Sequence, residues 1–270
     1  METHILLFVV SVMATAINSV AGGGGLLTFP VLMTVLPPVT ADATSAVALL
    51  PAYMTSTWAG RKHLVPVRHW FWRLLLPSLL GSLLGALLLS WSGNRSFTAL
   101  IPWLILIASL LTLRPLLSRT ARSRQSLSAP AAIETTSVPP VSLQVGASAL
   151  LFVVAIYGGY FGAGIGILVI AALDLIGLTN IHSVLPLKNA LCGSLRAVAV
   201  TVFLFEGKVN WKYGSVMAAG ALLGGYLGGS LVRWVNRTVV RIGIVALGVA
   251  ISAYYFWKTC GAGIQLFGHE

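Results

Sequence analysis

Long apolar stretches, separated by short polar connections, recur along the whole chain. A hydrocarbon core of about 30 Å needs roughly 20 helical residues to cross it. Strands of a transmembrane barrel would be shorter and would alternate apolar with polar positions, which these stretches do not. The pattern predicts an all-α polytopic membrane protein with apolar segments at residues 5–37, 43–60, 70–91, 97–117, 143–176, 182–205, 212–235 and 239–257.

A stretch rich in Ser, Pro and Arg interrupts this pattern at residues 118–142. It predicts a cytoplasmic linker between a first transmembrane repeat, residues 1–117, and a second, residues 143–270. Each repeat has four segments and opens with an overlong one that contains several glycines, which indicates two homologous halves. The correspondence aligns Gly23, Gly25, Leu27 and Leu32 with Gly164, Gly166, Leu168 and Leu173.

The first segment of each half is predicted to break at its glycines. A continuous helix over 5–37 would be about 50 Å long, too long for one span, and the consecutive Gly22 to Gly25 are among the poorest helix formers. Backbone that leaves the helix inside a membrane must be buried in protein or line a water-filled cavity. Paired glycine breaks at matching positions are typical of a transporter's central binding site. The alternative is that both segments are kinked packing helices.

Glycines of the third segments have a different interpretation. Small residues four positions apart let two helices approach closely in lipid. We therefore predict close helix packing at Gly81, Gly85, Gly220, Gly224 and Gly228.

Composition and charge agree with a membrane protein. Of 270 residues, 57% are hydrophobic and 9% are charged, against about 25% charged in soluble domains. The net charge of +11 fits cytoplasmic loops that face anionic lipid, and no base-stacking pattern accompanies it to indicate nucleic acid. Cys192 and Cys260 form neither a disulfide framework nor a C-x-x-C pair. The acidic start and the long first segment predict an N-terminus that is retained. We expect a multi-pass protein of the cell (inner, or cytoplasmic) membrane.

Basic residues orient the chain. Arg61, Lys62, Arg68 and Arg73 flank the connection between the second and third segments, which the positive-inside rule places in the cytoplasm. Two topologies share the same charge balance: eight full spans, or a re-entrant first segment in each half. Re-entrant segments leave an odd number of crossings per half and make the halves inverted repeats, which suit alternating access. We favour inverted repeats.

The sixth segment carries charged residues inside an apolar stretch. Asn189 and Arg196 are seven positions apart and Lys188 and Arg196 are eight apart, so all three share one helical face. Charges within a span are rare and functional, and two cations with no acid on their face predict an anion as ligand. The alternatives are that Lys188 extends to the membrane surface and that Arg196 pairs with Asp174 or Glu206.

The predicted anion site combines these cations with the glycine breaks. Helix N-termini and exposed glycine N–H groups bind anions, and several diverging donors suit a tetrahedral oxyanion such as sulfite or a sulfonate. Asn18, Thr44 and Ser45 are further candidates, with ordinary interhelical hydrogen bonding as the alternative. Cys192 is interpreted as a small core residue.

Motifs of both halves resemble those of a known family. They read G-G-G-G-L-L-T-F-P-V-L from Gly22, A-D-A-T-S from Ala41, Y-G-G-Y-F-G-A-G-I-G-I-L-V from Tyr157 and P-L-K-N from Pro186. As a set they resemble the two-repeat signature of the sulfite exporter TauE/SafE family of membrane permeases. The resemblance implies a secondary carrier of sulfur-containing anions, including sulfite and organosulfonates. It also implies a site made of Gly22, Gly23, Gly24, Gly25, Pro30, Thr44 and Ser45 in the first half and Gly162, Gly164, Gly166, Lys188 and Asn189 in the second. The second half departs from the first at Ala171, which stands where the first has Pro30, and at Gly164-Ile165-Gly166.

Other classes of function are weighed against a proton-coupled secondary transporter. An anion channel would use the same site. A metal or cation exporter would need acids or His and Cys clusters at membrane depth. An intramembrane enzyme would need a nucleophile and a base in reach, for which only His182 beside Ser183 or Cys192 is available. We expect a transporter with no catalytic residues, metal site or cofactor, whose partners are a small anion and membrane lipid, not nucleic acid, with a homodimer left open. His182, Asp174 and Glu206 all remain candidate proton carriers.

Overall fold

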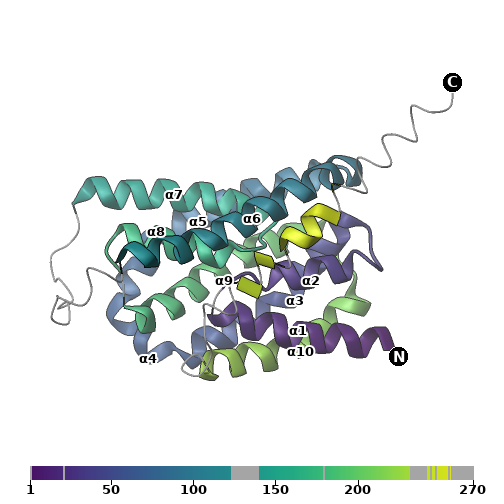
Figure 1. The fold of residues 1–270 in the computed structure, drawn as a ribbon, viewed down its shortest axis with the longest axis horizontal. Helices are drawn as coiled ribbons and strands as arrows, with labels where there is room; N and C mark the ends of the chain where they lie inside the picture. Colours follow the sequence, from purple (N-terminus) through teal and green to yellow (C-terminus); the bar gives the residue numbers. More distant parts are fainter. Residues whose placement is uncertain are drawn as a thin grey trace.

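The computed structural model describes residues 2–20, 22–122, 140–178 and 180–231, and most of 242–256 with gaps at 244, 247 and 255. Every named element in this part of the chain is a helix (Figure 1). The helices are α1 (Glu2–Val20), α2 (Gly25–Leu32), α3 (Pro38–Ala59), α4 (Arg61–Leu64), the 3-10 helix η1 (Val65–Val67), α5 (Arg68–Trp91), α6 (Asn94–Arg122), α7 (Val141–Tyr160), α8 (Ile165–Leu175), α9 (Ile181–Phe205) and α10 (Trp211–Leu231).

Two of the predicted regions are described only in part. The predicted linker, 118–142, overlaps the end of α6 and the start of α7, and its residues 123–139 lie outside the described residues. The eighth predicted segment, 239–257, is described at most of the positions from 242 to 256, and those positions are helical. Cys260 also lies outside the described residues.

Four stretches of the described helices are long and apolar enough to cross a membrane: Glu2–Ser19, Arg61–Trp91, Val141–Tyr160 and His182–Phe205. Large apolar side chains on their outer faces, such as Met13, Leu84 and Val153, are exposed, as contact with lipid requires. The fold is therefore that of a helical membrane protein, as predicted. The second predicted segment corresponds to α3, which is more polar than these four stretches. Its polar residues Asp42, Thr44 and Ser45 are buried among other helices.

Two pairs of helices pack closely along glycines. α1 lies along α10, and α5 lies along α7. A Cβ added at Gly224 of α10 would overlap the carbonyl oxygen of Val12, and one at Gly85 of α5 would overlap the carbonyl oxygen of Ile156. Only glycine permits these approaches, so the packing predicted for the third-segment glycines is confirmed.

The helices α3 and α9 pack against each other and run in opposite directions. Gly60, at the end of α3, packs against Pro186 near the start of α9. At the other end, the N–H of Asn210, which follows α9, donates to Thr44 Oγ1 near the start of α3 at 3.0 Å. The second segments of the two halves are therefore antiparallel.

Contacts between helices fix the directions of α1, α5, α7 and α10 relative to α3 and α9. Two helices are parallel when residue numbers increase in the same direction on both sides of their contact. The contacts Phe8–Gly220 and Ala16–Gly228 show this for α1 and α10, and Thr44–Gly214 and Thr55–Gly225 show it for α3 and α10. The contacts Gly81–Phe152 and Gly85–Ile156 show it for α5 and α7, and Ser82–Leu195 and Ser90–Lys208 show it for α5 and the end of α9. It follows that α1, α3 and α10 run one way, whereas α5, α7 and α9 run the other.

Helices are interrupted at the glycine stretch of each half. Between α1 and α2, Gly22 and Gly23 have φ angles of 74° and 108°. Between α7 and α8, Gly162 and Gly164 have φ angles of 68° and 76°. Residues with a Cβ rarely adopt these φ angles, because the Cβ collides with the backbone. Each interruption therefore depends on glycine.

The short helix α2 turns back beside α1 (Figure 1). At its start, Gly24 lies so close to Ala14 and Asn18 of α1 that an added Cβ would overlap the Ala14 carbonyl oxygen. One turn later, Thr28 Oγ1 is hydrogen-bonded to Ser45 Oγ near the start of α3, at 2.7 Å. Because α1 and α3 run the same way, α2 and the turn after it return the chain to the end of the molecule where α3 begins.

Candidate functional site

The two glycine interruptions meet inside the molecule. A Cβ added at Gly22 would lie 3.0 Å from the carbonyl carbon of Gly166, and one added at Gly25 would lie 3.1 Å from the Cα of Ala163. When Gly23 is aligned with Gly164, Gly22 corresponds to Ala163 and Gly25 to Gly166. The two contacts are thus equivalents of each other, and they bring the starts of α2 and α8 together.

Asn18, at the end of α1, organises the first interruption. Its Oδ1 accepts hydrogen bonds from the N–H groups of Gly23 and Gly24 at 3.2 and 3.3 Å, and its carbonyl oxygen accepts one from the N–H of Gly22 at 3.1 Å. The sequence predicts these glycine N–H groups as anion donors. In this conformation they are bonded to Asn18, which lies only one turn before them along the chain.

Lys188 is fully buried, at 0% exposure. Its Nζ donates to the carbonyl oxygen of Asn18 at 2.8 Å, and its side chain lies beside Gly166, where an added Cβ would be 3.2 Å from Lys188 Cδ. The alternative in which Lys188 extends to the membrane surface is therefore wrong. The side chain points instead to the meeting point of the two glycine interruptions.

Arg196 is also buried, at 1% exposure, and lies at the second interruption. Its Nη2 donates to the carbonyl oxygen of Phe161, directly after α7, at 3.2 Å. The guanidinium lies against Gly162, and a Cβ added there would overlap it. Within the described part of the chain, Nε and Nη1 of Arg196 have no hydrogen-bond partner.

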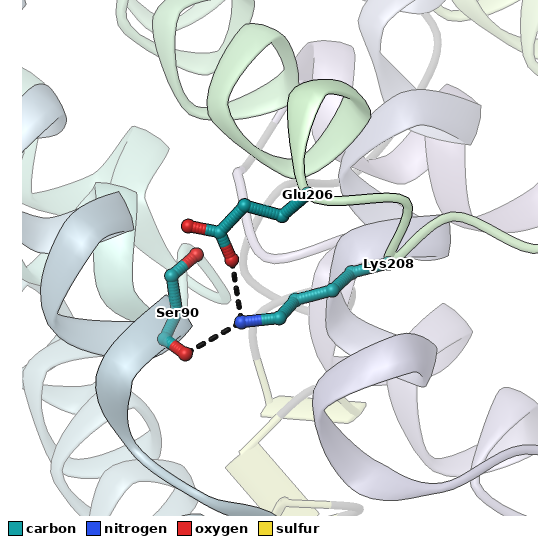
Figure 2. A network of polar contacts seen from close by, with 3 residues as sticks. All are labelled: Ser90, Glu206 and Lys208. Carbon is teal, nitrogen blue, oxygen red and sulfur yellow. Dashed lines mark hydrogen bonds and ion pairs between the residues drawn. The ribbon is translucent and has the colours of Figure 1, made fainter.

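Of the acids that the sequence offers as partners for Arg196, Glu206 is bonded elsewhere. Its carboxylate pairs with Lys208 Nζ at 2.6 Å, and the same ammonium donates to the carbonyl oxygen of Ser90 in α5 at 2.5 Å (Figure 2). Burial alone would raise the pKa of Glu206, but the hydrogen bond from Lys208 and the charge of Lys208 lower it overall. The alternative in which Arg196 pairs with Glu206 is therefore wrong. Asp174 is exposed in the last turn of α8.

Asp42 of α3 is the acid that sequence reasoning missed. It is 1% exposed, and its Oδ2 has no hydrogen-bond partner among the described residues. Its carboxyl interacts electrostatically with Arg196 of α9 and with Tyr157 of α7. The cations therefore do share their surroundings with an acid, which comes from the other half of the chain. The sequence feature that could have identified Asp42 is its position as a single acid between Ala41 and Ala43, at the edge of an apolar segment.

The other predicted polar residues divide into two groups. Thr44 accepts from Asn210, and Ser45 is bonded to Thr28, so both make the interhelical hydrogen bonds given as their alternative. Asn189 is 3% exposed, and its Oδ1 has no hydrogen-bond partner among the described residues. It is placed in the core next to Lys188, with its acceptor unused.

Two uncharged side chains complete the surroundings of the cations. Cys192 is a free, fully buried cysteine within electrostatic range of both Lys188 and Arg196, which fits a small core residue. Tyr53 of α3, 3% exposed, interacts with the side chains of Asn18 and Arg196. Tyr53 was not predicted as a site residue, because an aromatic residue in an apolar helix is interpreted as part of the hydrophobic core.

The arrangement is a buried polar centre between the halves. It holds two cations, one acid and the starts of two short helices, whose N-terminal ends favour negative charge. No group of three or more His, Cys, Asp or Glu side chains in the described residues is placed to hold a metal ion. Buried polar atoms without partners carry a desolvation cost that a bound polar ligand would remove.

Known proteins resemble this chain over nearly its full length. The sequence profile of the family described as sulfite exporter TauE/SafE matches residues 7–255. A probable membrane transporter protein of Haemophilus influenzae is 32% identical over 252 residues, covering 92% of each chain. The probable membrane transporter protein YfcA of Escherichia coli strain K12 is 27% identical, covering 96% of this chain and 91% of its own. The probable membrane transporter protein YunE of Bacillus subtilis is 26% identical, covering 89% and 93%. No solved structure matches significantly.

Proposed function

Because the chain belongs to the sulfite exporter TauE/SafE family and its relatives are named probable membrane transporter proteins, we propose that it is a secondary transporter of a small sulfur-containing anion. The anion is sulfite or an organosulfonate, and it crosses the cell membrane by alternating access coupled to protons. On this proposal the protein is a multi-pass permease and not an enzyme.

Arg196 carries the proposal. It is a charged group in the core whose Nη2 donates to Phe161, while Nε and Nη1 have no hydrogen-bond partner among the described residues. A guanidinium is always ionised and prefers oxyanions, to which it donates short, charge-assisted hydrogen bonds. An anion with several oxygens would accept hydrogen bonds from Nε and Nη1, which have no such partner in the part of the chain that the structure describes.

Lys188 and the glycine interruptions support the same ligand. Lys188 adds a second buried positive charge, and Cys192 lies within electrostatic range of both cations. The starts of α2 and α8 meet beside Lys188, at Gly22 and Gly166. We infer that an anion at this point is held by both cations and by the N-terminal ends of the two short helices.

The helix directions support alternating access by inverted repeats. The second segments, α3 and α9, are antiparallel, and α1 and α10 run opposite to α7 and α5. The return of α2 beside α1 supports a re-entrant first segment, broken at its glycines. Transporters built in this way bind substrate where discontinuous helices of the two repeats meet, near the middle of the membrane.

Thermal unfolding of the purified full-length protein against a panel of anions tests the proposal. The panel is sulfite, thiosulfate, sulfate, methanesulfonate, formate and chloride, with Mg²⁺ and Zn²⁺ as cation probes. A ligand at about 100 times its Kd stabilises the folded state by about 2.7 kcal/mol. We expect a sulfur oxyanion to raise the Tm and Arg196→Gln to abolish that rise, whereas Lys208→Gln, a cation outside the site, keeps it.

Two results would overturn the proposal: stabilisation by divalent cations alone, or by no member of the panel. Uptake into proteoliposomes separates a carrier from an anion channel. A carrier coupled to protons accumulates the anion beyond its own gradient when a pH gradient is imposed, and a channel does not.

A further inference from the structure

Asp42 is a buried acid that has no role in binding the anion at Lys188, Arg196 and the starts of α2 and α8. It lies in the second turn of α3, is 1% exposed, and has an Oδ2 without a hydrogen-bond partner among the described residues. A carboxylate in such a place carries a large desolvation cost unless a cation balances it. The nearby charge is that of Arg196, on α9 of the other half.

Other titratable groups lie on the described helices around Asp42. Arg196 of α9 and Tyr157 of α7 are its electrostatic neighbours, and α2 carries no titratable side chain. The other helices that pack on α3 bring further groups to the end where α3 begins. These are His4 on α1, Arg95 on α6, the pair Glu206–Lys208 between α9 and α10, and Lys212 and Tyr213 on α10. Lys188 on α9 and Tyr53 on α3 lie toward the other end.

The charge of Asp42 competes with that of the anion. With Asp42 ionised, the centre formed by Lys188, Arg196 and Asp42 has a net charge of +1, and with Asp42 protonated it has +2. Removing the negative charge therefore strengthens the attraction of the centre for an anion. By reciprocity, a bound anion strengthens proton binding to Asp42 by the same factor.

We propose that Asp42 is the proton carrier of the transporter and takes up one proton as the anion binds. The step is the conversion of the Asp42 carboxylate into a neutral carboxyl, which leaves Arg196 to the anion. Proton and anion then occupy the centre together and cross in the same direction. The inference rests on the proposed function and names the coupling group that the sequence leaves open among His182, Asp174 and Glu206.

The position of Asp42 suits this role in alternating access. Asp42 belongs to the first half and Arg196 to the second, so a movement of one half against the other changes their separation. A group whose proton affinity depends on that separation is coupled to the conformational change. Glu206, by contrast, is paired with Lys208 outside the centre.

Binding of methanesulfonate at different pH values tests the proposal, because this sulfonate keeps a single negative charge between about pH 5 and 8. We expect the affinity of the wild-type protein to fall about fivefold or more between pH 6 and pH 8, the range of an ordinary coupling between two sites. Asp42→Asn imitates the protonated carboxyl. It should bind at pH 8 about as tightly as the wild type binds at pH 6, with no remaining pH dependence.

His4→Gln is the matched control, because His4 is an ionisable side chain that lies near the same end of α3, beside Tyr213. It should keep the wild-type pH dependence. Loss of that dependence in His4→Gln, or its persistence in Asp42→Asn, would overturn the proposal. If Asp42→Asn does not fold, the number of protons taken up by the wild type on binding the anion can be measured by calorimetry in buffers of different ionisation enthalpy. Uptake of about one proton per anion supports the inference, and uptake of none overturns it.

Failure of the inference and failure of the proposed function give different results. Tight binding that is independent of pH in the wild type overturns the role of Asp42 and leaves the anion transporter intact. No binding of any sulfur oxyanion at pH 6 overturns the transporter function, and the inference with it.

Discussion

At the scale of single residues, each buried cation is bonded to the end of an interrupted helix. Lys188 donates to the carbonyl oxygen of Asn18 near the end of α1, and Arg196 donates to that of Phe161 after α7. A cation at a helix C-terminus is favourable, typically by about 0.3–1 kcal/mol at exposed sites. The two side chains therefore both hold the interruptions in place and present positive charge at the point where they meet.

Substitution of Lys188 by alanine should weaken anion binding by about tenfold or more, because a charge-assisted hydrogen bond contributes roughly 1.5–3 kcal/mol. Lys188→Arg should not restore the affinity, since a planar guanidinium is larger than an ammonium and the side chain lies so close to Gly166 that a Cβ added there would be 3.2 Å from Lys188 Cδ. The anion affinity of both variants can be measured from the rise of the Tm with anion concentration. The exposed Lys212→Ala is the control, and equal affinity in Lys188→Ala and the wild type would contradict the assignment.

Gly162 should be required for the position of Arg196. An alanine at this position would overlap the guanidinium and would adopt a φ of 68°. The strain of a positive φ alone costs about 1–2 kcal/mol, and Gly177→Ala, with a φ of 82° and open space around it, carries that strain without the overlap. We expect both variants to lose thermal stability, but only Gly162→Ala to lose stabilisation by the anion. Retained anion stabilisation in Gly162→Ala would remove Arg196 from the site.

At the scale of elements, the interruption between α1 and α2 should be essential for transport. Replacing Gly23, Gly24 and Gly25 together by alanine introduces a Cβ at a φ of 108°, an overlap with Ala14, and a Cβ 3.1 Å from the Cα of Ala163. Alanine also favours a continuous helix by about 1 kcal/mol per position. The variant should reach the membrane but not transport the anion into proteoliposomes.

The control for the triple variant is Gly146→Ala, in α7, where an added Cβ meets nothing within 4 Å. It should transport like the wild type. Normal transport by the triple variant would mean that the interruption has no part in the mechanism.

At the scale of the whole molecule, the two ends of α9 should lie on opposite sides of the membrane. Lys62 is exposed near the start of α9, and Lys212 is exposed beyond its end. With re-entrant first segments, an impermeant thiol reagent should label Lys62→Cys from the cytoplasm and Lys212→Cys from outside, in a background without Cys192 and Cys260. Labelling of both from the cytoplasm would instead establish eight full spans.

Features that depend on local pattern can be predicted from the order of the residues alone. Apolar length predicts the helices, four glycines in a row predict a stretch that cannot stay helical, and glycines four apart predict where helices approach closely. These features follow from the length of a membrane span, from the helical repeat and from the absence of a Cβ. The motifs were also sufficient to predict the family, and they singled out Lys188 and Arg196 as charges within an apolar segment.

Which polar groups meet depends on how the helices pack in three dimensions. Lys188 and Asn18 are 170 positions apart, and Asp42 and Arg196 come from opposite halves, so no period or spacing along the chain relates them. The structure buries Lys188 instead of leading it to the surface, pairs Glu206 with Lys208, and bonds the glycine N–H groups to Asn18. The physical reason is that the energy of a buried charge or N–H group depends on its neighbours in space. Those neighbours are set by the packing of antiparallel helices from the two halves.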